Sequence, residues 1–302
     1  MSSSILPHTT PLMSRKLPEH LQPRKMPIRL SDGYETYAYV YPPVAGALPR
    51  LPVLYLHGIQ SHPLWFTGSA AALAQAGHAV YQVARRGSGE NARDRGHAES
   101  ARQLLDDVAC VSRVIREQTG ARRLHLLGVS WGGKLAAAHA LQGPPQAKPA
   151  SLTLVAPGLA PRVDVPPATK CLIAAALLLN PRGMFDIPLN DVELFTENPS
   201  MQDYLRRDEL RLCRATAKFL YASRRLDRLL AAAKPASLTM PTTLLLADRD
   251  RIINAKRTVD LLGRLAGPRL KAISFPAAHT LEFEPLPQDI FNAMAEAMKR
   301  GE

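Results

Sequence analysis

Short apolar runs and segments of helical periodicity alternate along most of this chain. The apolar runs predict strands at 36–41, 53–56, 79–83, 124–127, 152–155, 243–247 and 270–275. The periodic segments predict helices at 70–76, 100–118, 134–138 and around 259–265. This alternation of strands and helices indicates an α/β fold, with a mostly parallel central sheet covered by helices on both faces.

Two stretches depart from this alternation. Residues 158–240 are leucine-rich and read as helical without a strand candidate, although they fall between two expected strands. We therefore predict a helical cap inserted over the carboxyl ends of the strands, where ligands bind in such sheets. Residues 1–27 are rich in proline, serine and basic residues and predict a mobile N-terminal arm. The core would then comprise residues 28–157 and 241–302.

Length and composition narrow the class of protein. The 302 residues, 46% of them hydrophobic, suffice for one large α/β domain with an insertion, or for two small domains. No apolar run approaches the roughly 20 residues that a membrane span requires, and the N-terminus lacks the pattern of a signal peptide. Three cysteines are expected to be reduced thiols, which favours a cytoplasmic location. Since no Cys/His cluster is evident, neither a metal nor a cofactor is predicted.

Half of the net charge of +12 lies in one region. Between Arg206 and Lys234, nine basic residues face three acidic ones, so this segment supplies half of the excess. Leucines interleave with the arginines, a spacing that predicts an amphipathic helix with a solvated basic face. Peripheral contact of this face with anionic lipid is the alternative. Nucleic-acid binding is not expected, because no aromatic interleaving or recognised motif accompanies the charge.

The segment Gly128-Val129-Ser130-Trp131-Gly132 carries the clearest chemical signal. It joins an expected strand to an expected helix, the context in which G-x-S-x-G forms a nucleophile elbow. Flanking glycines permit the close approach of strand and helix, and the turn presents the serine hydroxyl at a helix N-terminus. Ser130 is therefore the candidate nucleophile, against the alternative of a structural turn that merely contains serine.

A serine hydroxyl needs a base, which a carboxylate in turn orients. In α/β-hydrolases these groups follow in the order Ser, Asp or Glu, His. His279 lies after the last expected strand, whereas His139 lies inside the elbow helix and points elsewhere. Asp250 is favoured as the carboxylate over Asp248, because the turn after the strand needs a few residues before the acid can point inward.

The oxyanion hole requires two backbone donors. The N–H of Trp131, directly after the nucleophile, is one. The second is expected after the strand at 53–56, where Ile59 is favoured and Gln60 is the alternative. His57 in this loop is predicted to be a hydrogen-bonded structural residue, and a role for His62 stays open. The loop at 87–89 lacks the spacing of a phosphate-binding motif and is predicted to be a tight turn.

With these residues in hand, the chain resembles α/β-hydrolases of the monoacylglycerol lipase and lysophospholipase-like group, the serine aminopeptidase S33-type hydrolases. The resemblance implies Ser130 as nucleophile, Asp250 and His279 as its partners, and Ile59 and Trp131 as oxyanion donors. It spans about residues 31–298, and the matching segments are 56–59, 86–89, 127–133, 246–253 and 277–280, with the cap stretch 194–199 and Asp208.

The expected activity is that of a cofactor-free serine hydrolase. It would cleave a small-molecule carboxylic ester with an apolar acyl group, such as a monoacylglycerol or lysophospholipid, through an acyl-enzyme. Thioesterase, lactonase, amidase and acyltransferase activities would use the same residues. A non-catalytic protein that binds a ligand under the cap is the alternative from another class. The sequence gives no indication of the oligomeric state.

Overall fold

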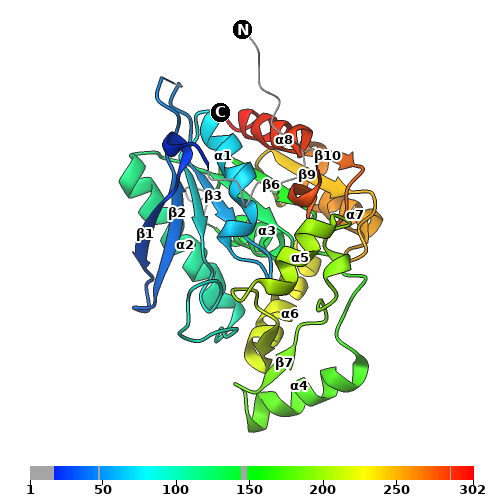
Figure 1. The fold of residues 1–302 in the computed structure, drawn as a ribbon. Coiled ribbons are helices and arrows are strands. Elements are labelled where there is room, and N and C mark those ends of the chain that lie inside the picture. The colour runs from blue at the N-terminus through cyan, green and yellow to red at the C-terminus, as the bar shows by residue number, and fades with distance from the viewer. Residues whose placement is uncertain (1–16, 47, 144–147, 286) are drawn as a thin grey trace.

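The computed structural model of the protein describes residues 17–46, 48–143, 148–285 and 287–302. Within them, an eight-stranded sheet forms the centre of the fold, in the order β1-β2-β4-β3-β5-β6-β9-β10 (Figure 1). Only the β1–β2 and β2–β4 pairs of this sheet are antiparallel. The strands are β1 (Arg24–Arg29), β2 (Glu35–Tyr41), β3 (Val53–Leu56), β4 (Val80–Val83), β5 (His125–Val129), β6 (Ser151–Val155), β9 (Thr242–Ala247) and β10 (Leu270–Phe275).

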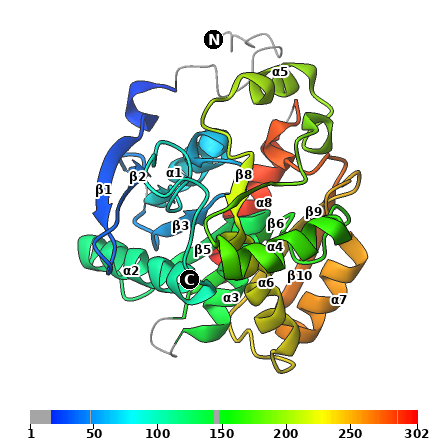
Figure 2. The same ribbon diagram turned by 90° about the horizontal axis from the view of Figure 1, so that it is seen from below.

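Helices cover both faces of the sheet, as predicted. Helices α1 (Thr67–Gln75) and α8 (Gln288–Lys299) contact each other on one face, and α2 (Ala101–Thr119) and α3 (Trp131–Gln142) do so on the other (Figure 2). Helix α7 (Ala255–Ala266) packs on β9 and β10. Single 3-10 turns complete the core at η2 (Glu19–Leu21), η3 (Pro63–Phe66), η6 (Gly267–Arg269) and η7 (Leu281–Phe283).

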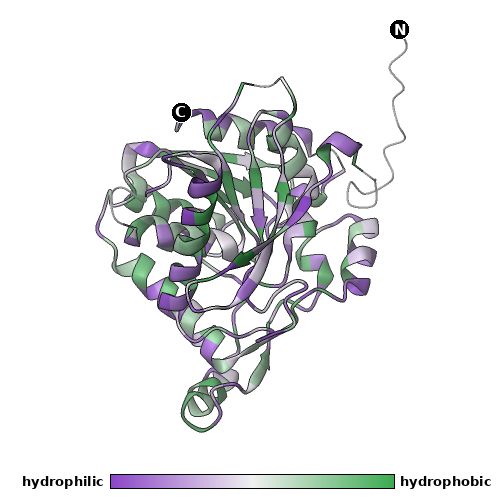
Figure 3. Cartoon of the chain, turned by 90° about the vertical axis from the view of Figure 1, so that its left-hand side faces the viewer, coloured by the Kyte–Doolittle hydropathy of each residue, from purple (hydrophilic) through white to green (hydrophobic). Residues whose placement is uncertain are grey.

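Burial on both faces explains the continuous apolar runs of the central strands. Every residue of β3, β5, β6 and β9 is buried, and hydrophobic residues concentrate along these strands (Figure 3). A strand exposed on one face would instead alternate apolar and polar residues. None of the helices in the described part of the chain has the length and apolar character needed to cross a bilayer.

The segment between β6 and β9 lies beyond the carboxyl ends of the strands, on the opposite side of the molecule from the C-terminus (Figure 1). The prediction that it contains no strand was wrong, since β7 and β8 form a small antiparallel pair. Its elements are α4 (Pro167–Leu179), β7 (Met184–Asp186), η5 (Val192–Leu194), α5 (Pro199–Arg207), β8 (Arg214–Thr216) and α6 (Ala217–Ala232).

A single amphipathic helix over 206–234 was also wrongly predicted. Helix α5 ends at Arg207, and α6 begins only at Ala217, after β8. The side chain of Thr216 accepts a hydrogen bond from the Phe219 N–H and thereby caps the start of α6. The basic residues of this region are therefore distributed over two helices and a strand.

The last residues of the predicted N-terminal arm form a strand in the structure. Residues 1–16 lie outside the described residues, but 24–27 belong to β1. In this strand Pro27 pairs with Tyr37 of β2. A proline lacks the N–H that a central strand would need, and it is tolerated here because β1 is the edge strand of the sheet.

Candidate active site

Ser130 occupies a strained turn between β5 and α3. Its φ of 52° and ψ of −122° lie in a region that non-glycine residues rarely adopt. The Ser130 N–H donates to the Val155 carbonyl at 2.9 Å, and its own carbonyl accepts from Gly133 and Gly158. These bonds hold the turn in place against a conformational strain of about 1–3 kcal/mol.

The close approach of α3 to β3 explains the second glycine of the motif. A Cβ at Gly132 would lie 2.4 Å from the carbonyl oxygens of both Leu56 and His57. Such a contact is far inside van der Waals distance and would push the elbow away from the loop that follows β3. Glycine at this position therefore fixes the distance between Ser130 and that loop.

His279 lies between Ser130 and Asp250. Its Nε2 is 2.9 Å from Ser130 Oγ, and its Nδ1 is 2.8 Å from Asp250 Oδ2. The carboxylate can only accept a hydrogen bond, so the Nδ1–H donates to it and Nε2 is left to accept the serine proton. The side chains of His279 and Asp250 are each 2% exposed, which shields their hydrogen bond from water.

Asp250 is held as an anion. Its Oδ1 accepts the backbone N–H groups of Ile252 and Ile253 at 2.8 and 2.9 Å. Burial opposes ionisation, but the hydrogen bonds from His279 and from these two amides outweigh it and lower the pKa of Asp250. Asp248, the alternative carboxylate, follows the end of β9 directly and is exposed to solvent.

The two predicted oxyanion donors lie beside Ser130. Ile59 and Trp131 both line the cavity that contains the serine. Within the described residues, the backbone N–H groups of Ile59 and Trp131 donate to no protein acceptor. A free backbone donor beside a nucleophile can receive a developing negative charge. Gln60 lies in the same loop, where its carbonyl accepts from the Leu212 N–H of the inserted segment.

Arg85 contacts both predicted donors. Its guanidinium donates to the Ile59 carbonyl at 2.9 Å. The Cζ atom lies 5.0 Å from the centroid of the Trp131 ring and 4.8 Å from that of Phe219. Burial lowers the pKa of Arg85 to about 9, so the side chain is still a cation at neutral pH. No motif in the sequence signals this position.

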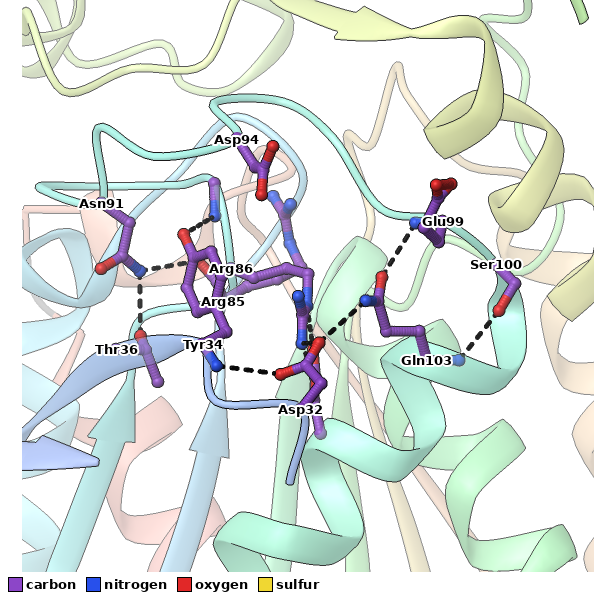
Figure 4. A network of polar contacts seen from close by, with 12 residues as sticks. Asp32, Tyr34, Thr36, Arg85, Arg86, Asn91, Asp94, Glu99, Ser100 and Gln103 are labelled. Atoms are coloured by element: carbon purple, nitrogen blue, oxygen red, sulfur yellow. Dashed lines mark hydrogen bonds and ion pairs between the residues drawn. The ribbon is translucent and has the colours of Figure 1, made fainter. Parts of the chain in front are cut away.

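The loop that carries Arg85 is anchored by a polar network (Figure 4). Arg86 is bonded to Asp107 at 2.6 Å and to Asp32 at 2.9 Å. The Asn91 amide donates to Thr36 at 2.9 Å. These bonds fix the loop after β4 and thereby the guanidinium of Arg85.

The two histidines after β3 have structural partners. The Nδ1–H of His57 donates to the Gly58 carbonyl, and its Nε2 accepts the Arg85 N–H at 3.1 Å. Burial lowers the pKa of His57 well below its ordinary value, so this ring is neutral. His62 Nε2 lies 3.0 Å from Asp208, which ties the core to the inserted segment. Neither histidine contacts Ser130 through a hydrogen bond in the described structure.

A cavity of about 480 Å³ opens from Ser130 into the inserted segment. Its wall is mostly aliphatic and includes residues of α4, the segment after β7, α6 and the turn after β9, among them Ile173, Leu177, Leu189, Leu220 and Ile252. Two carboxylates also line it, but Asp164 is bonded to Lys170 at 2.5 Å and Asp227 to Lys134 at 2.7 Å. Both are therefore neutralised by a partner.

Phe195 of the inserted segment contacts the loop that carries His279. Its ring lies 6.1 Å from the His279 ring in an edge-to-face arrangement. Its carbonyl accepts the Thr280 N–H at 2.8 Å. The inserted segment thus packs directly on the histidine loop.

A family model described as serine aminopeptidase, S33, matches residues 47–285. The match covers most of the chain, including the elbow, the inserted segment and the histidine loop. The chain belongs to this family. It is accordingly an α/β-hydrolase and a serine hydrolase, as the resemblance implied.

Solved structures with the same fold include esterases and lipases. A monoacylglycerol lipase of Paleococcus ferrophilus has a TM-score of 0.76 and 21% identity, covering 89% of this chain and 100% of its own. A soluble variant of monoglyceride lipase from Saccharomyces cerevisiae, in complex with a substrate analog, gives 0.80 and 16%, covering 93% and 96%. A thermostable carboxyl esterase from Bacillus coagulans, in complex with glycerol, gives 0.75 and 15%, covering 91% and 97%. A comparison with curated proteins found no significant match.

Proposed function

We propose that this member of the S33 family hydrolyses carboxylic esters of apolar acyl groups, with Ser130 as nucleophile, His279 as base and Asp250 as the orienting carboxylate. The observation that carries the proposal is the hydrogen-bonded chain from Ser130 Oγ through His279 to Asp250, which opens on an aliphatic cavity. The proposed substrate class is a monoacylglycerol or lysophospholipid, because its acyl chain would lie against the aliphatic wall of the cavity.

The reaction follows from the geometry of these three residues. Ser130 Oγ attacks the carbonyl carbon while its proton passes to His279 Nε2. The oxyanion is stabilised by the N–H groups of Ile59 and Trp131. The C–O bond to the leaving alcohol then breaks, and His279 returns the proton to that alcohol. Water, deprotonated by the same nitrogen, releases the carboxylic acid and restores the Ser130 hydroxyl.

The cavity favours an ester over a peptide with a free amino terminus. An aminopeptidase must hold the ammonium group of its substrate, and a carboxylate is the usual partner for that charge. Asp164 and Asp227 are the carboxylates in the cavity wall, and each is bonded to a lysine. An uncharged acyl chain needs no such partner and gains from the aliphatic wall.

The first test is labelling by a fluorophosphonate probe. We expect wild type to react and Ser130→Ala not to react, whereas Ser223→Ala, a serine in the same cavity wall, should still be labelled. A series of p-nitrophenyl esters would then measure the acyl length that the cavity accepts, alongside thioester and amide analogues. Absence of labelling in well-folded wild type would favour the non-catalytic binding protein instead.

We also propose a peripheral contact with anionic lipid through α4 and α6. No residue of α4 is buried, and Leu178 and Leu179 are each 86% exposed. This helix lies at the end of the molecule and is largely hydrophobic (Figure 3). Helix α6 beside it exposes Arg224 and Arg225. Binding to anionic but not neutral vesicles, weakened by salt, is expected; salt-independent binding would argue against a role for the arginines.

A cytoplasmic location is part of the same proposal. All three cysteines, Cys110, Cys171 and Cys213, lie within the described residues and are free thiols. Free thiols are typical of a reducing compartment. Alkylation of these thiols in freshly lysed cells would test the location.

A further inference from the structure

Two buried histidines lie at the end of the sheet opposite to Ser130. His125 is the first residue of β5, and His78 precedes β4 by two positions. Both side chains are fully buried, and their rings meet edge to face with centroids 5.4 Å apart. Because β5 has five residues, roughly 16 Å of strand separates this pair from the elbow.

The hydrogen bonds of the two rings leave the same nitrogen free in each. His78 Nδ1 lies 2.8 Å from the Leu51 carbonyl, which can only accept, so Nδ1 carries the proton. His125 Nδ1 is bonded to Ser151 Oγ at 2.8 Å. Within the described residues, the Nε2 atoms of His78 and His125 have no hydrogen-bond partner despite their burial. A buried polar atom without a partner is unfavourable by about 1–3 kcal/mol, which points to a ligand between them.

A carboxylate completes the cluster. Glu302 Oε1 lies 3.9 Å from His125 Nε2, and the three side chains each place one ligand atom within 4.8 Å of the others. The second oxygen of Glu302 accepts from Arg50 at 2.8 Å. Because the proton of His78 lies on Nδ1, its Nε2 is the unprotonated nitrogen, the form of imidazole that coordinates metals.

We propose that His78 Nε2, His125 Nε2 and the Glu302 carboxylate bind a divalent first-row transition metal, with zinc as the best match. Two imidazoles and a carboxylate are a recurrent zinc set, which leaves a fourth position for water. Zn–ligand bonds of about 2.0–2.2 Å separate neighbouring ligand atoms by roughly 3.3–3.6 Å. The cluster reaches this spacing by a small contraction, which Glu302, 28% exposed, can supply.

The surroundings favour zinc over calcium or magnesium. Arg50 neutralises part of the Glu302 charge, and calcium and magnesium prefer several oxygen ligands. Imidazole nitrogen suits the transition metals. The hydrogen bonds of Leu51 and Ser151 hold the rings in the orientation that coordination needs, as outer partners of metal-bound histidines do. A cavity of about 870 Å³, lined by Arg50, Leu51 and Glu302, adjoins the carboxylate side of the cluster.

The metal would have a structural role. It would join Glu302, which follows α8, to the amino ends of β4 and β5, far from the Ser130 hydroxyl. Residues 78, 125 and 302 are too far apart in the sequence for a spacing motif, which is why no metal was predicted from the sequence.

The test is a titration of the full-length, metal-free protein with Zn²⁺, followed by calorimetry and metal analysis. We expect one ion per chain, with an increase in Tm that is larger in wild type than in the ligand variants at the same Zn²⁺ concentration. Glu302→Gln and His125→Gln should each weaken binding by at least about 10-fold. The matched controls are Glu296→Gln, an exposed carboxylate of α8, and His20→Gln, an exposed histidine; both should bind as wild type does.

Glu302→Gln is the decisive variant, because its side chain is partly exposed and its loss leaves the core intact. Cobalt substitution gives an independent signal, since a tetrahedral nitrogen and oxygen site produces visible ligand-field bands. These bands should be present in wild type and reduced in Glu302→Gln. The proposal is overturned if wild type binds no stoichiometric Zn²⁺, or if folded Glu302→Gln binds it as tightly as wild type. A bridging water would then satisfy the two imidazoles.

Discussion

The carboxylate of Asp250 lies 2.8 Å from Nδ1 of His279, and its other oxygen is fixed by the amides of Ile252 and Ile253. Asp250→Asn would preserve the shape of this contact but could donate to Nδ1, which stabilises the wrong tautomer of the histidine. We expect kcat to fall by about 10⁴-fold, the loss that follows when a triad aspartate is so replaced. Steady-state kinetics with a p-nitrophenyl ester would measure it.

Asp248→Asn is the matched control for this substitution. Asp248 is exposed in the same turn and has no hydrogen bond to His279 within the described structure. Its replacement should change kcat by less than about twofold, as for most surface positions. Equal losses in both variants would contradict the assignment of Asp250.

Arg85 connects the two sides of the predicted oxyanion hole. It donates to the Ile59 carbonyl and stacks over the Trp131 ring. Arg85→Met retains much of the apolar stem but removes the hydrogen bond and the charge. We expect kcat to fall by up to about 100-fold through displaced donors, with a small change in KM. Arg113→Gln, an exposed arginine of α2, should leave both constants unchanged; a pure KM effect of Arg85→Met would indicate a role in substrate binding instead.

The G-x-S-x-G motif and the order of residues along the chain predicted Ser130, Asp250 and His279, and the structure places these three side chains in contact. The reason is that a strand–turn–helix pattern and the ends of parallel strands are local features, and the sheet places those ends at one edge. Arg85 could not be found in this way. Its role depends on Trp131 and Phe219, which approach it only in the folded protein.

The errors in the fold have similar causes. Strand β8 is three residues long and depends on pairing with β7, about thirty positions earlier. A prediction from helical periodicity alone therefore includes its residues in one long helix. Strand β1 contains a proline, which is tolerated only at the edge of a sheet, and its edge position could not be known from local pattern.

Glu282 predicts a pH-dependent stability. This buried carboxyl accepts hydrogen bonds from the N–H and hydroxyl of Ser69 in α1. Burial raises the pKa of Glu282 to about 7, against an ordinary value of 4.5. The folded state therefore retains a proton that the unfolded state loses between these values. Its contribution to the free energy of unfolding should fall by about 3 kcal/mol as the pH rises from 4.5 to 7.

Urea denaturation of wild type and Glu282→Gln across this range would test the effect. The glutamine does not titrate, so the difference in unfolding free energy between the two proteins should change with pH. Glu193→Gln, at an exposed position, should follow wild type throughout. Parallel pH profiles of wild type and Glu282→Gln would show that this carboxyl is ionised in the folded state.

Gly132 and Gly263 provide opposite outcomes for the same substitution. At Gly132 a methyl group would meet two carbonyl oxygens at 2.4 Å, whereas at Gly263 in α7 it would meet no atom within 4 Å. Gly132→Ala should destabilise the fold by about 1–3 kcal/mol. It should also reduce kcat by about 100-fold, because the elbow moves relative to Ile59. Gly263→Ala should raise the free energy of unfolding by about 0.5–1 kcal/mol, since alanine favours the helix. Full activity in Gly132→Ala would mean that the contact between α3 and β3 does not position Ser130.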